Sequence, residues 1–370
     1  MLKKEELIRY NRHIILSDFG IEKQELLKAA KVLVIGAGGL GCPILQYLVA
    51  AGVGKITILD GDYIDISNLQ RQVLYSVEDV GYPKAIIAAQ KLQKQNQFIN
   101  IIGIQENLNT SNALKYISQH DLVIDGCDNF ATRYLVNDAC VLSNKPFIYG
   151  SIFKFEGQVA VFNYKNGATY RCVFPEPPLP NEVPSCSDVG VIGVLPGIIG
   201  VLQATEAIKL ICKIGNTLDN KILIYDALTN HQTILELSKN ESIKIDKLEE
   251  DYNVFCGVLP PKNILESNEI SAIDLQKFID NPDLQIIDVR EDWEYEICRI
   301  PNSILIPLKT LPYQLHKIDT DKTKVFVCHH GIRSKNAIEY LELNGFNNLL
   351  NLTGGIHEWA LSVDKSMNKY

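Results

Sequence analysis

A short apolar run followed at once by closely spaced glycines constrains the N-terminal part of the chain most. KVLVI (31–35) is rich in β-branched residues, as buried strands are, and GAGGLG (36–41) follows it directly. The next segment (43–52) has helical spacing and ends in glycine, and KITILD (55–60) is a second predicted buried strand. This strand–turn–helix–strand order predicts the first half of a doubly wound α/β sheet.

The glycine-rich turn predicts a nucleotide site. Gly36, Gly38 and Gly41 match the G-x-G-x-x-G spacing, which lets backbone approach phosphate groups at a helix N-terminus. Asp60 closes the second strand, where an acidic side chain can bond ribose hydroxyls. A packing turn with a surface aspartate is the alternative, and the strand-to-helix context disfavours it.

Cationic and acidic residues at the ends of further strands favour ATP over a dinucleotide. Arg71 and Lys84 follow Asp60 along the chain, and the leaving pyrophosphate of ATP needs such charge neutralisation. Asp128, in DGCDN (125–129), follows another predicted strand and is suited to hold Mg²⁺. Any one of these charges is more often a solvated surface residue, but together they predict a site.

The rest of the chain predicts an antiparallel extension and a second domain. FEGQVAVFNY (155–164) alternates as antiparallel strands do, and the segment 171–188 carries five of the 15 prolines. LPPKNILESNE (259–269) has the composition of a linker. We therefore predict a nucleotide-binding domain over 1–250, a linker over 251–267, and a small α/β domain over 268–370.

Composition narrows the function classes. Hydrophobic residues make up 46% of the 370 residues and the formal net charge is −8, which favours a globular protein and disfavours a nucleic-acid-binding surface. No run reaches the ~18 apolar residues of a membrane span, and the N-terminus lacks a signal-peptide pattern. Nine scattered cysteines predict reduced thiols and a cytoplasmic location.

Seven motifs in order resemble the MoeB/ThiF activating enzymes, relatives of the ubiquitin-activating enzymes, over residues 7–240. They are RYNRHIILSDFG (9–20), GAGGLGCP (36–43), LDGDYIDISNLQRQ (59–72), GYPKA (81–85), DGCDN (125–129), RYLVNDAC (133–140) and FEGQ (155–158). The resemblance implies a Rossmann-like doubly wound sheet with an antiparallel extension, and a homodimer. It also implies Mg-ATP-dependent adenylation of the C-terminal glycine of a ubiquitin-like sulfur carrier that ends in Gly-Gly.

The resemblance also implies roles for individual residues. The ATP-binding positions it implies are Gly36, Gly38, Gly39, Gly41, Asp60, Ser67, Asn68, Arg71, Lys84, Asp128 and Asn129. Of these, Arg71 is also expected to act in catalysis, and Asp128, assisted by Asn129, is expected to bind magnesium. Arg12 is expected to reach across the dimer to the partner subunit's ATP.

The cysteines divide into reactive and buried groups. Cys186, in VPSCSDVGVIG within the proline-rich segment, matches the family thiol that attacks the acyl-adenylate or receives the carrier. A buried loop cysteine is the alternative for Cys186. Four others lie in apolar helix or strand contexts and are predicted to be small core residues: Cys42, Cys127, Cys140 and Cys212.

The family's zinc site is incomplete in this chain. The family usually has two Cys-x-x-Cys pairs, but here Thr169 stands before Cys172 and Asn253 before Cys256. Two thiolates do not make a structural zinc site. We therefore predict that Cys172 and Cys256 are remnants, that zinc is absent, and that apolar contacts pack these two segments.

The C-terminal part resembles the rhodanese domain. DVREDWEYEICRIPNSILIPL (288–308), CHHGIRS (328–334) and LTGGIHEWA (352–360) carry the resemblance. Cys328 leaves a predicted buried strand and enters a six-residue loop that ends at Arg333. Such a loop can wrap N–H groups around one sulfur, and Arg333 with the following helix would stabilise a persulfide anion. His329 and His330 are adjacent, so we predict that they diverge and pack the loop rather than bind a metal.

Together the two resemblances imply a sulfur relay. The first domain adenylates the carrier, and Cys328, loaded by a cysteine desulfurase or another sulfur donor, converts the activated carboxylate into a thiocarboxylate with help from Cys186. Such carriers serve molybdopterin, thiamine or thiolated-tRNA synthesis, and the motifs favour molybdopterin. An NAD-dependent oxidoreductase and a non-catalytic scaffold are the rival classes. The cationic set disfavours the first, and the complete nucleotide motif disfavours the second.

Overall fold

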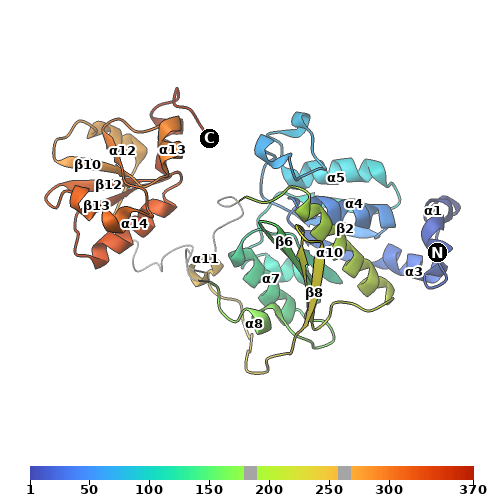
Figure 1. The fold of residues 1–370 in the computed structure, drawn as a ribbon. Coiled ribbons are helices and arrows are strands. Elements are labelled where there is room, and N and C mark those ends of the chain that lie inside the picture. The colour runs from blue at the N-terminus through green and yellow to red at the C-terminus, as the bar shows by residue number, and fades with distance from the viewer. Residues whose placement is uncertain (179–189, 257–267) are drawn as a thin grey trace. The chain divides into compact units, whose positions relative to one another are not determined.

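The computed structural model describes residues 1–178, 190–256 and 268–370, and it divides into two units, Met1–Leu259 and Pro260–Tyr370 (Figure 1). Cys186 and residues 257–267 of the predicted linker lie outside the described residues.

An eight-stranded sheet forms the centre of the first unit. Its strands, in spatial order, are β3 (Asn100–Ile104), β2 (Lys55–Leu59), β1 (Lys31–Ile35), β4 (Leu122–Asp125), β5 (Phe147–Phe153), β6 (Glu156–Phe162), β7 (Lys221–Asp226) and β8 (His231–Glu236). The five strands from β3 to β5 run parallel, and the pairs β5–β6, β6–β7 and β7–β8 are antiparallel. The predicted doubly wound sheet with an antiparallel extension is confirmed.

Helices cover both faces of this sheet. One face packs against α4 (Gly41–Ala51), α5 (Lys84–Gln95) and α10 (Leu195–Cys212), and the other against α6 (Ala113–Ser118), α7 (Phe130–Leu142) and α11 (Tyr252–Phe255). Strand β1 shows why its sequence is apolar throughout. Val32 and Val34 point into the first core, while Leu33 and Ile35 point into the second.

Shorter elements complete the first unit. They are α1 (Lys4–Arg9), α2 (Asn11–Ile14), α3 (Gly20–Ala29), α8 (Tyr170–Val173) and two 3-10 turns, η1 (Ile66–Asn68) and η2 (Val77–Asp79). Helix α11 falls within the range predicted as a linker. Its residue Tyr252 is buried in the core that contains α7, so the folded part of the first unit continues beyond residue 250.

Helix α10 is the one described helix that is long and apolar enough to cross a membrane. It packs against α4, β5 and β6, and 56% of it is buried inside the unit. A core helix of a soluble protein passes the same test of length and composition, so α10 is weak evidence for a membrane span.

The second unit is a small parallel α/β domain. Its strands, in spatial order, are β11 (Ser303–Leu305), β10 (Leu284–Asp288), β12 (Thr323–Val327), β13 (Leu349–Leu352) and β9 (Glu269–Ile270). Its helices are α12 (Ala272–Lys277), α13 (Asp292–Ile297), α14 (Ile332–Leu343) and α15 (Gly355–Ser362), with 3-10 turns η4 (Leu311–Tyr313) and η5 (Leu315–Lys317). All strand pairs are parallel, and apolar clusters lie on both faces.

Candidate functional site

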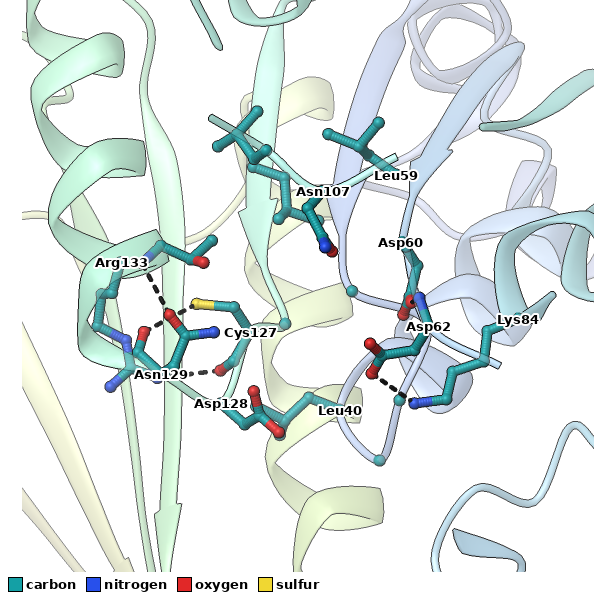
Figure 2. Close-up of a pocket in the computed structure, with 18 of the residues that line it drawn as sticks. Leu40, Leu59, Asp60, Asp62, Lys84, Asn107, Cys127, Asp128, Asn129 and Arg133 are labelled. Atoms are coloured by element: carbon teal, nitrogen blue, oxygen red, sulfur yellow. Dashed lines mark hydrogen bonds and ion pairs between the residues drawn. The ribbon is translucent and has the colours of Figure 1, made fainter. Parts of the chain in front are cut away.

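A cavity of about 340 Å³ opens where β1, β2 and β4 end (Figure 2). Strands β1 and β4 are neighbours in the sheet, but the chain continues from β1 toward β2 on one side and from β4 toward β5 on the other. Doubly wound sheets bind ligands at this topological switch point, outside the carboxyl ends of the strands. The cavity therefore lies where this fold class places a nucleotide.

The four predicted glycines have two different roles. Gly36 has φ +90°, and a Cβ there would lie 2.6 Å from the Gly126 carbonyl oxygen, while one at Gly41 would lie 2.1 Å from that of Gly36. These two positions need glycine because backbone segments touch there. Gly36, Gly38 and Gly39 line the cavity, and Gly41 is not among the lining residues.

Asp60 fixes the glycine-rich turn to the end of β2. Its carboxylate accepts hydrogen bonds from the backbone N–H groups of Ala37 at 2.7 Å and Asp62 at 2.8 Å. Burial raises the pKa of Asp60. On the same wall, the buried Lys84 ammonium pairs with Asp62 at 2.9 Å (Figure 2).

The remaining predicted residues are only partly brought together. Arg71 lines the cavity, and its guanidinium donates to the Ser67 carbonyl at 3.2 Å. Asp128 and Asn129 are exposed on the opposite wall (Figure 2). Asn129 also caps α7 by accepting from the Thr132 N–H at 2.8 Å. Polar groups of both signs therefore face one space.

Besides Gly41, three predicted residues lie off the cavity lining. Ser67 donates its hydroxyl to Asp65 at 2.6 Å, and Asn68 lies beside it in η1. Arg12 is exposed on α2 and does not line the cavity.

The sequence analysis missed several lining residues, and two of them, Arg133 and Gln72, are buried and polar. Arg133 is buried and donates from Nε to Asp125 at 3.1 Å and from Nη2 to the carbonyls of Cys127 and Gly150 at 3.1 and 3.2 Å. Gln72 is buried, and its Oε1 has no hydrogen-bond partner among the described residues. A ligand that donates to this oxygen would satisfy it. Gln72 and Arg133 both lie within motifs that carry the family resemblance, 59–72 and 133–140, and this position could have indicated a role in the site.

The segments around Cys172 and Cys256 are joined by a buried polar cluster rather than by apolar contacts alone. Arg171 donates to both oxygens of Asp138 at 2.8 and 2.6 Å, and the Tyr252 hydroxyl donates to Asp138 at 2.6 Å. The Arg171 guanidinium also lies 4.6 Å from the centre of the Phe255 ring. The predicted apolar packing is present, since Tyr170, Tyr252 and Cys256 lie in the core that contains α7. It is incomplete, because Asp138, on α7, also accepts hydrogen bonds from both segments.

Most of the thiols that the structure describes in the first unit are buried. Cys172 Sγ accepts hydrogen bonds from the N–H groups of Thr169 and Asn240, each at 3.3 Å, and burial raises the pKa of Cys256 to about 11. The core placement of four further thiols is confirmed, and burial raises the pKa of each: Cys42, Cys127, Cys140 and Cys212.

In the second unit the loop after β12 wraps around Cys328, which is only 1% exposed. The Gly331 N–H donates to its sulfur at 3.0 Å. The Ser334 hydroxyl, which donates to Asn351 at 2.5 Å, lies 3.3 Å from the same sulfur. The Gly331 N–H and the Ser334 hydroxyl oxygen, which contact the sulfur, are both uncharged.

Arg333 forms an ion pair beside this loop. Its guanidinium donates to both oxygens of Glu294, at 2.6 and 2.7 Å. Although burial opposes ionisation of Glu294, hydrogen bonds from Arg333, the Glu291 backbone and Tyr370 lower its pKa to about 2. A second pair, Arg290 with Asp288 at 2.7 Å, is fully buried nearby.

The two adjacent loop histidines do not diverge as predicted. The His329 and His330 ring centres lie 4.2 Å apart, and α15 adds His357, which the sequence analysis missed. Burial lowers the pKa of His329 to about 4.

Comparison with known sequences assigns each unit to a protein family or domain type. The sequence model of the ThiF family matches residues 10–245, and that of the rhodanese-like domain matches residues 271–362. The chain belongs to the ThiF family. This ThiF-family chain is 43% identical to "Probable adenylyltransferase/sulfurtransferase MoeZ" of Mycobacterium tuberculosis, over 100% of this chain and 96% of that protein.

Other relatives agree. The "Adenylyltransferase and sulfurtransferase MOCS3" of Arabidopsis thaliana is 35% identical over 100% of this chain and 86% of that protein. The "Sulfur carrier protein adenylyltransferase" of Thermus thermophilus is 48% identical over 69% of this chain and 98% of that protein. The predicted class, an adenylyltransferase fused to a sulfurtransferase, is confirmed.

A solved structure shares the fold of the first unit. The crystal structure of E. coli MccB with ATP superposes with a TM-score of 0.57 at 24% identity, over 64% of this chain and 73% of that one. At this identity the likeness shows the fold alone.

Proposed function

We propose that the first unit uses ATP to adenylate the C-terminal glycine of a ubiquitin-like sulfur carrier protein ending in Gly-Gly, and that the second unit delivers sulfur to it as a Cys328 persulfide. The observation that carries this proposal is the switch-point cavity, which Arg71, Lys84 and Asp128 line together with the glycine-rich turn. The Thermus thermophilus relative, named for its action on a sulfur carrier protein, supports the class of partner.

In the first reaction a carboxylate oxygen of the carrier attacks the α-phosphorus of ATP, and the bond to the bridging oxygen breaks to release pyrophosphate. Arg71 and Lys84 neutralise charge on the leaving group, and Asp60 bonds the ribose hydroxyls. Asp128, assisted by Asn129, would hold Mg²⁺, which would supply further charge neutralisation at the phosphates.

In the second reaction the outer sulfur of the Cys328 persulfide attacks the acyl carbon, and AMP leaves. The product is an acyl disulfide between the carrier and Cys328. The Cys186 thiolate then attacks Cys328 Sγ, so the carrier departs as a thiocarboxylate and a Cys186–Cys328 disulfide forms. An external thiol reduces that disulfide, and a cysteine desulfurase or another persulfide donor reloads Cys328.

The proposal includes a homodimer in which Arg12 reaches the partner subunit's ATP. The exposed position of Arg12 supports it, as do exposed apolar side chains in the same N-terminal segment, Ile8, Ile15 and Leu16. We further propose a cytoplasmic location, no structural zinc at Cys172 and Cys256, and a role in molybdopterin synthesis. Thiamine synthesis and tRNA thiolation are the alternative pathways.

Exchange of labelled pyrophosphate into ATP tests the adenylation. We expect exchange only with a Gly-Gly-ending carrier and Mg²⁺, and we expect its loss in Asp128→Ala. Asp246→Ala, which removes an exposed carboxylate away from the cavity, is the matched control. Exchange without the carrier, or full exchange in Asp128→Ala, contradicts the proposal. Mass spectrometry of the carrier should show the addition of AMP and then of sulfur.

Mixing two inactive variants tests the shared site. Arg12→Ala and Asp128→Ala should each lack activity, while mixed dimers regain part of it because one of their two sites is intact. If labelled subunits exchange and no activity returns, Arg12 does not act across the dimer.

A further inference from the structure

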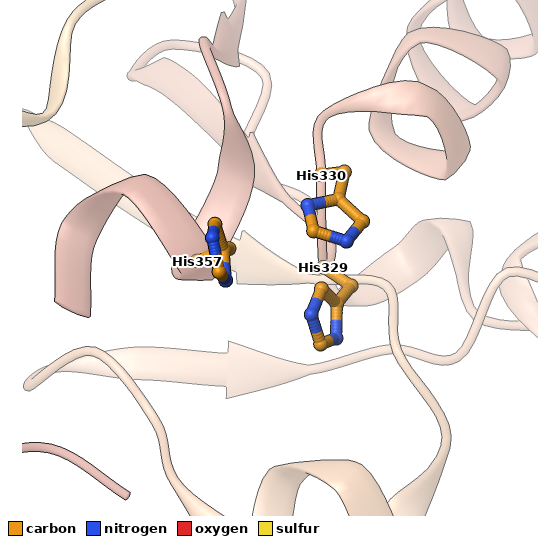
Figure 3. Close-up of side chains that lie close together, drawn as sticks. All are labelled: His329, His330 and His357. Atoms are coloured by element: carbon orange, nitrogen blue, oxygen red, sulfur yellow. The ribbon is translucent and has the colours of Figure 1, made fainter. Parts of the chain in front are cut away.

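Three histidines gather at the mouth of the thiol loop in the second unit. His329 and His330 follow Cys328 directly, and His357 comes from the first turn of α15 (Figure 3). One ring nitrogen from each lies within 4.8 Å of the others. The ring centres of His330 and His357 are 5.0 Å apart. Residues distant in the sequence therefore present three imidazoles to one point.

The backbone holds this cluster in place. The N–H of Ile356 donates to the Cys328 carbonyl at 2.8 Å, and the N–H of His357 donates to the His329 carbonyl at 3.1 Å. A Cβ at Gly355 would lie 2.3 and 2.4 Å from the same two carbonyl oxygens. Glycine at this position lets α15 begin against the loop, so the imidazoles meet without any rearrangement of the backbone.

The imidazoles are chemically available. These three side chains form no hydrogen bond with any residue that the structure describes in this unit. His330 is also exposed. Nitrogen ligands of this kind suit Zn²⁺, Ni²⁺ and Cu²⁺ rather than Mg²⁺ or Ca²⁺. Three histidines with an open fourth position form a known type of zinc centre, in which bound nitrogens lie roughly 3.4 Å apart. To hold one ion together, the three nitrogens must approach to that spacing from within 4.8 Å, by rotation of the imidazoles about their side-chain bonds.

Nearby charges do not oppose a cation strongly. The two arginines around the loop are each paired with a carboxylate, Arg290 with Asp288 and Arg333 with Glu294. Their charges are therefore offset within the unit. A divalent ion can enter the cluster without facing uncompensated positive charge.

We infer that His329, His330 and His357 bind one exchangeable Zn²⁺-class ion, and that the bound ion slows the loading of sulfur onto Cys328. Cys328 is 1% exposed, so its loop must move to admit a sulfur donor. An ion bound by His329 and His330 in the loop and by His357 on α15 would restrict movement of the loop. Without hydrogen-bond acceptors behind the imidazoles, the site is expected to bind metal moderately and reversibly.

Titration of the full chain with Co²⁺ tests the binding, which does not depend on the proposed reaction. We expect one equivalent to produce the visible absorption of a low-coordinate Co²⁺ centre and Zn²⁺ to displace it. His330→Gln and His357→Gln should each weaken binding at least ~10-fold, because each removes one ligand. His316→Gln, an exposed histidine elsewhere in the unit, should not. Because His330 is exposed, its loss is not expected to affect folding.

Unchanged Co²⁺ affinity in both His330→Gln and His357→Gln, or no binding by the native chain up to millimolar Co²⁺, would overturn the site. The inhibitory role rests on sulfur transfer by Cys328 and is tested separately, by mass spectrometry of the persulfide that thiosulfate loads onto Cys328. Zn²⁺ should inhibit the native chain and the His316→Gln control over the range in which it binds, and inhibit His357→Gln at least ~10-fold less effectively. Equal inhibition of all three would mean that the ion acts on the thiol alone, and would overturn the role.

Discussion

The two sites differ in how completely their charges are paired. Lys84 and Arg133, which line the cavity of the first unit, are paired with Asp62 and Asp125. At the cavity of the first unit, neither Arg71 nor Asp128 forms an ion pair with any residue that the structure describes, and both face open space. Around Cys328, by contrast, Arg290 and Arg333 are each closed by a carboxylate. The difference indicates that a charged substrate completes the first site, whereas the second is completed by its own chain and holds one sulfur.

The largest effect should come from Cys328→Ser. Serine cannot carry a persulfide, so sulfur transfer should fall at least ~10³-fold, while carrier-dependent pyrophosphate exchange stays unchanged. Cys186→Ala should leave both partial reactions intact and slow only release of the thiocarboxylate. Loss of pyrophosphate exchange in a folded Cys328→Ser chain would show that the two sites are not separable.

The next largest effect concerns the buried polar cluster of Arg171, Asp138 and Tyr252, which does not line the first cavity. Arg171→Met should destabilise the first unit by about 3–5 kcal/mol, because it leaves the buried Asp138 carboxylate unpaired. Lys221→Met, which breaks an exposed pair with Glu236, should cost about 1 kcal/mol or less. Urea unfolding followed by circular dichroism compares them, and equal effects would contradict the assigned importance of the cluster.

Metal analysis checks the same region. If the Arg171 cluster joins the two segments in place of a metal, the dialysed His357→Gln chain should hold well under one zinc ion per chain. This variant removes the histidine site from the measurement. Near-stoichiometric zinc after exhaustive dialysis would contradict the prediction.

Removing one arginine from each site, Arg71 or Arg333, sharpens the comparison further. Arg71→Ala should lower pyrophosphate exchange about 10²-fold and change stability by less than about 0.5 kcal/mol, since it closes no internal pair. Arg333→Ala should leave pyrophosphate exchange unchanged and destabilise the second unit by about 2–3 kcal/mol, because Glu294 is then buried without its partner. The opposite pattern would mean that the two sites handle charge alike.

The smallest effect is a pH dependence of the second unit. The folded pKa of Glu294, about 2, lies below its ordinary value of 4.5. The ionised carboxylate therefore contributes stability that is fully present above pH 4.5 and is lost as the pH falls toward 2, on the order of 1–2 kcal/mol. Both tryptophans of the chain, Trp293 and Trp359, lie in this unit, so their fluorescence reports it alone. Glu294→Gln should flatten the acid transition, and an unchanged transition would show that other groups cause it.

Much of the fold follows from local sequence patterns. The run 31–35 with its glycines determines a strand, a turn and a helix, and the residues that end neighbouring strands gather because parallel strands share one edge. Long-range polar partners leave no such pattern. Asp138 pairs with residues 33 and 114 positions away, and on a helix it is indistinguishable from a solvent-facing aspartate. His357 was missed for the same reason, since only the folded backbone brings α15 onto the loop.

Because the groups that contact the Cys328 sulfur are uncharged, the second site should respond less to ionic strength than the first. Dissolved salt weakens attraction between exposed charges, with a screening length of about 10 Å at 0.1 M. The open cavity relies on such attraction, whereas the sulfur is held by the Gly331 N–H and the Ser334 hydroxyl inside a buried loop. Rising salt should therefore slow activation of the carrier well before it disturbs the loaded thiol. In concentrated salt we therefore expect the Cys328 persulfide to persist, because little activated carrier is formed to accept its sulfur.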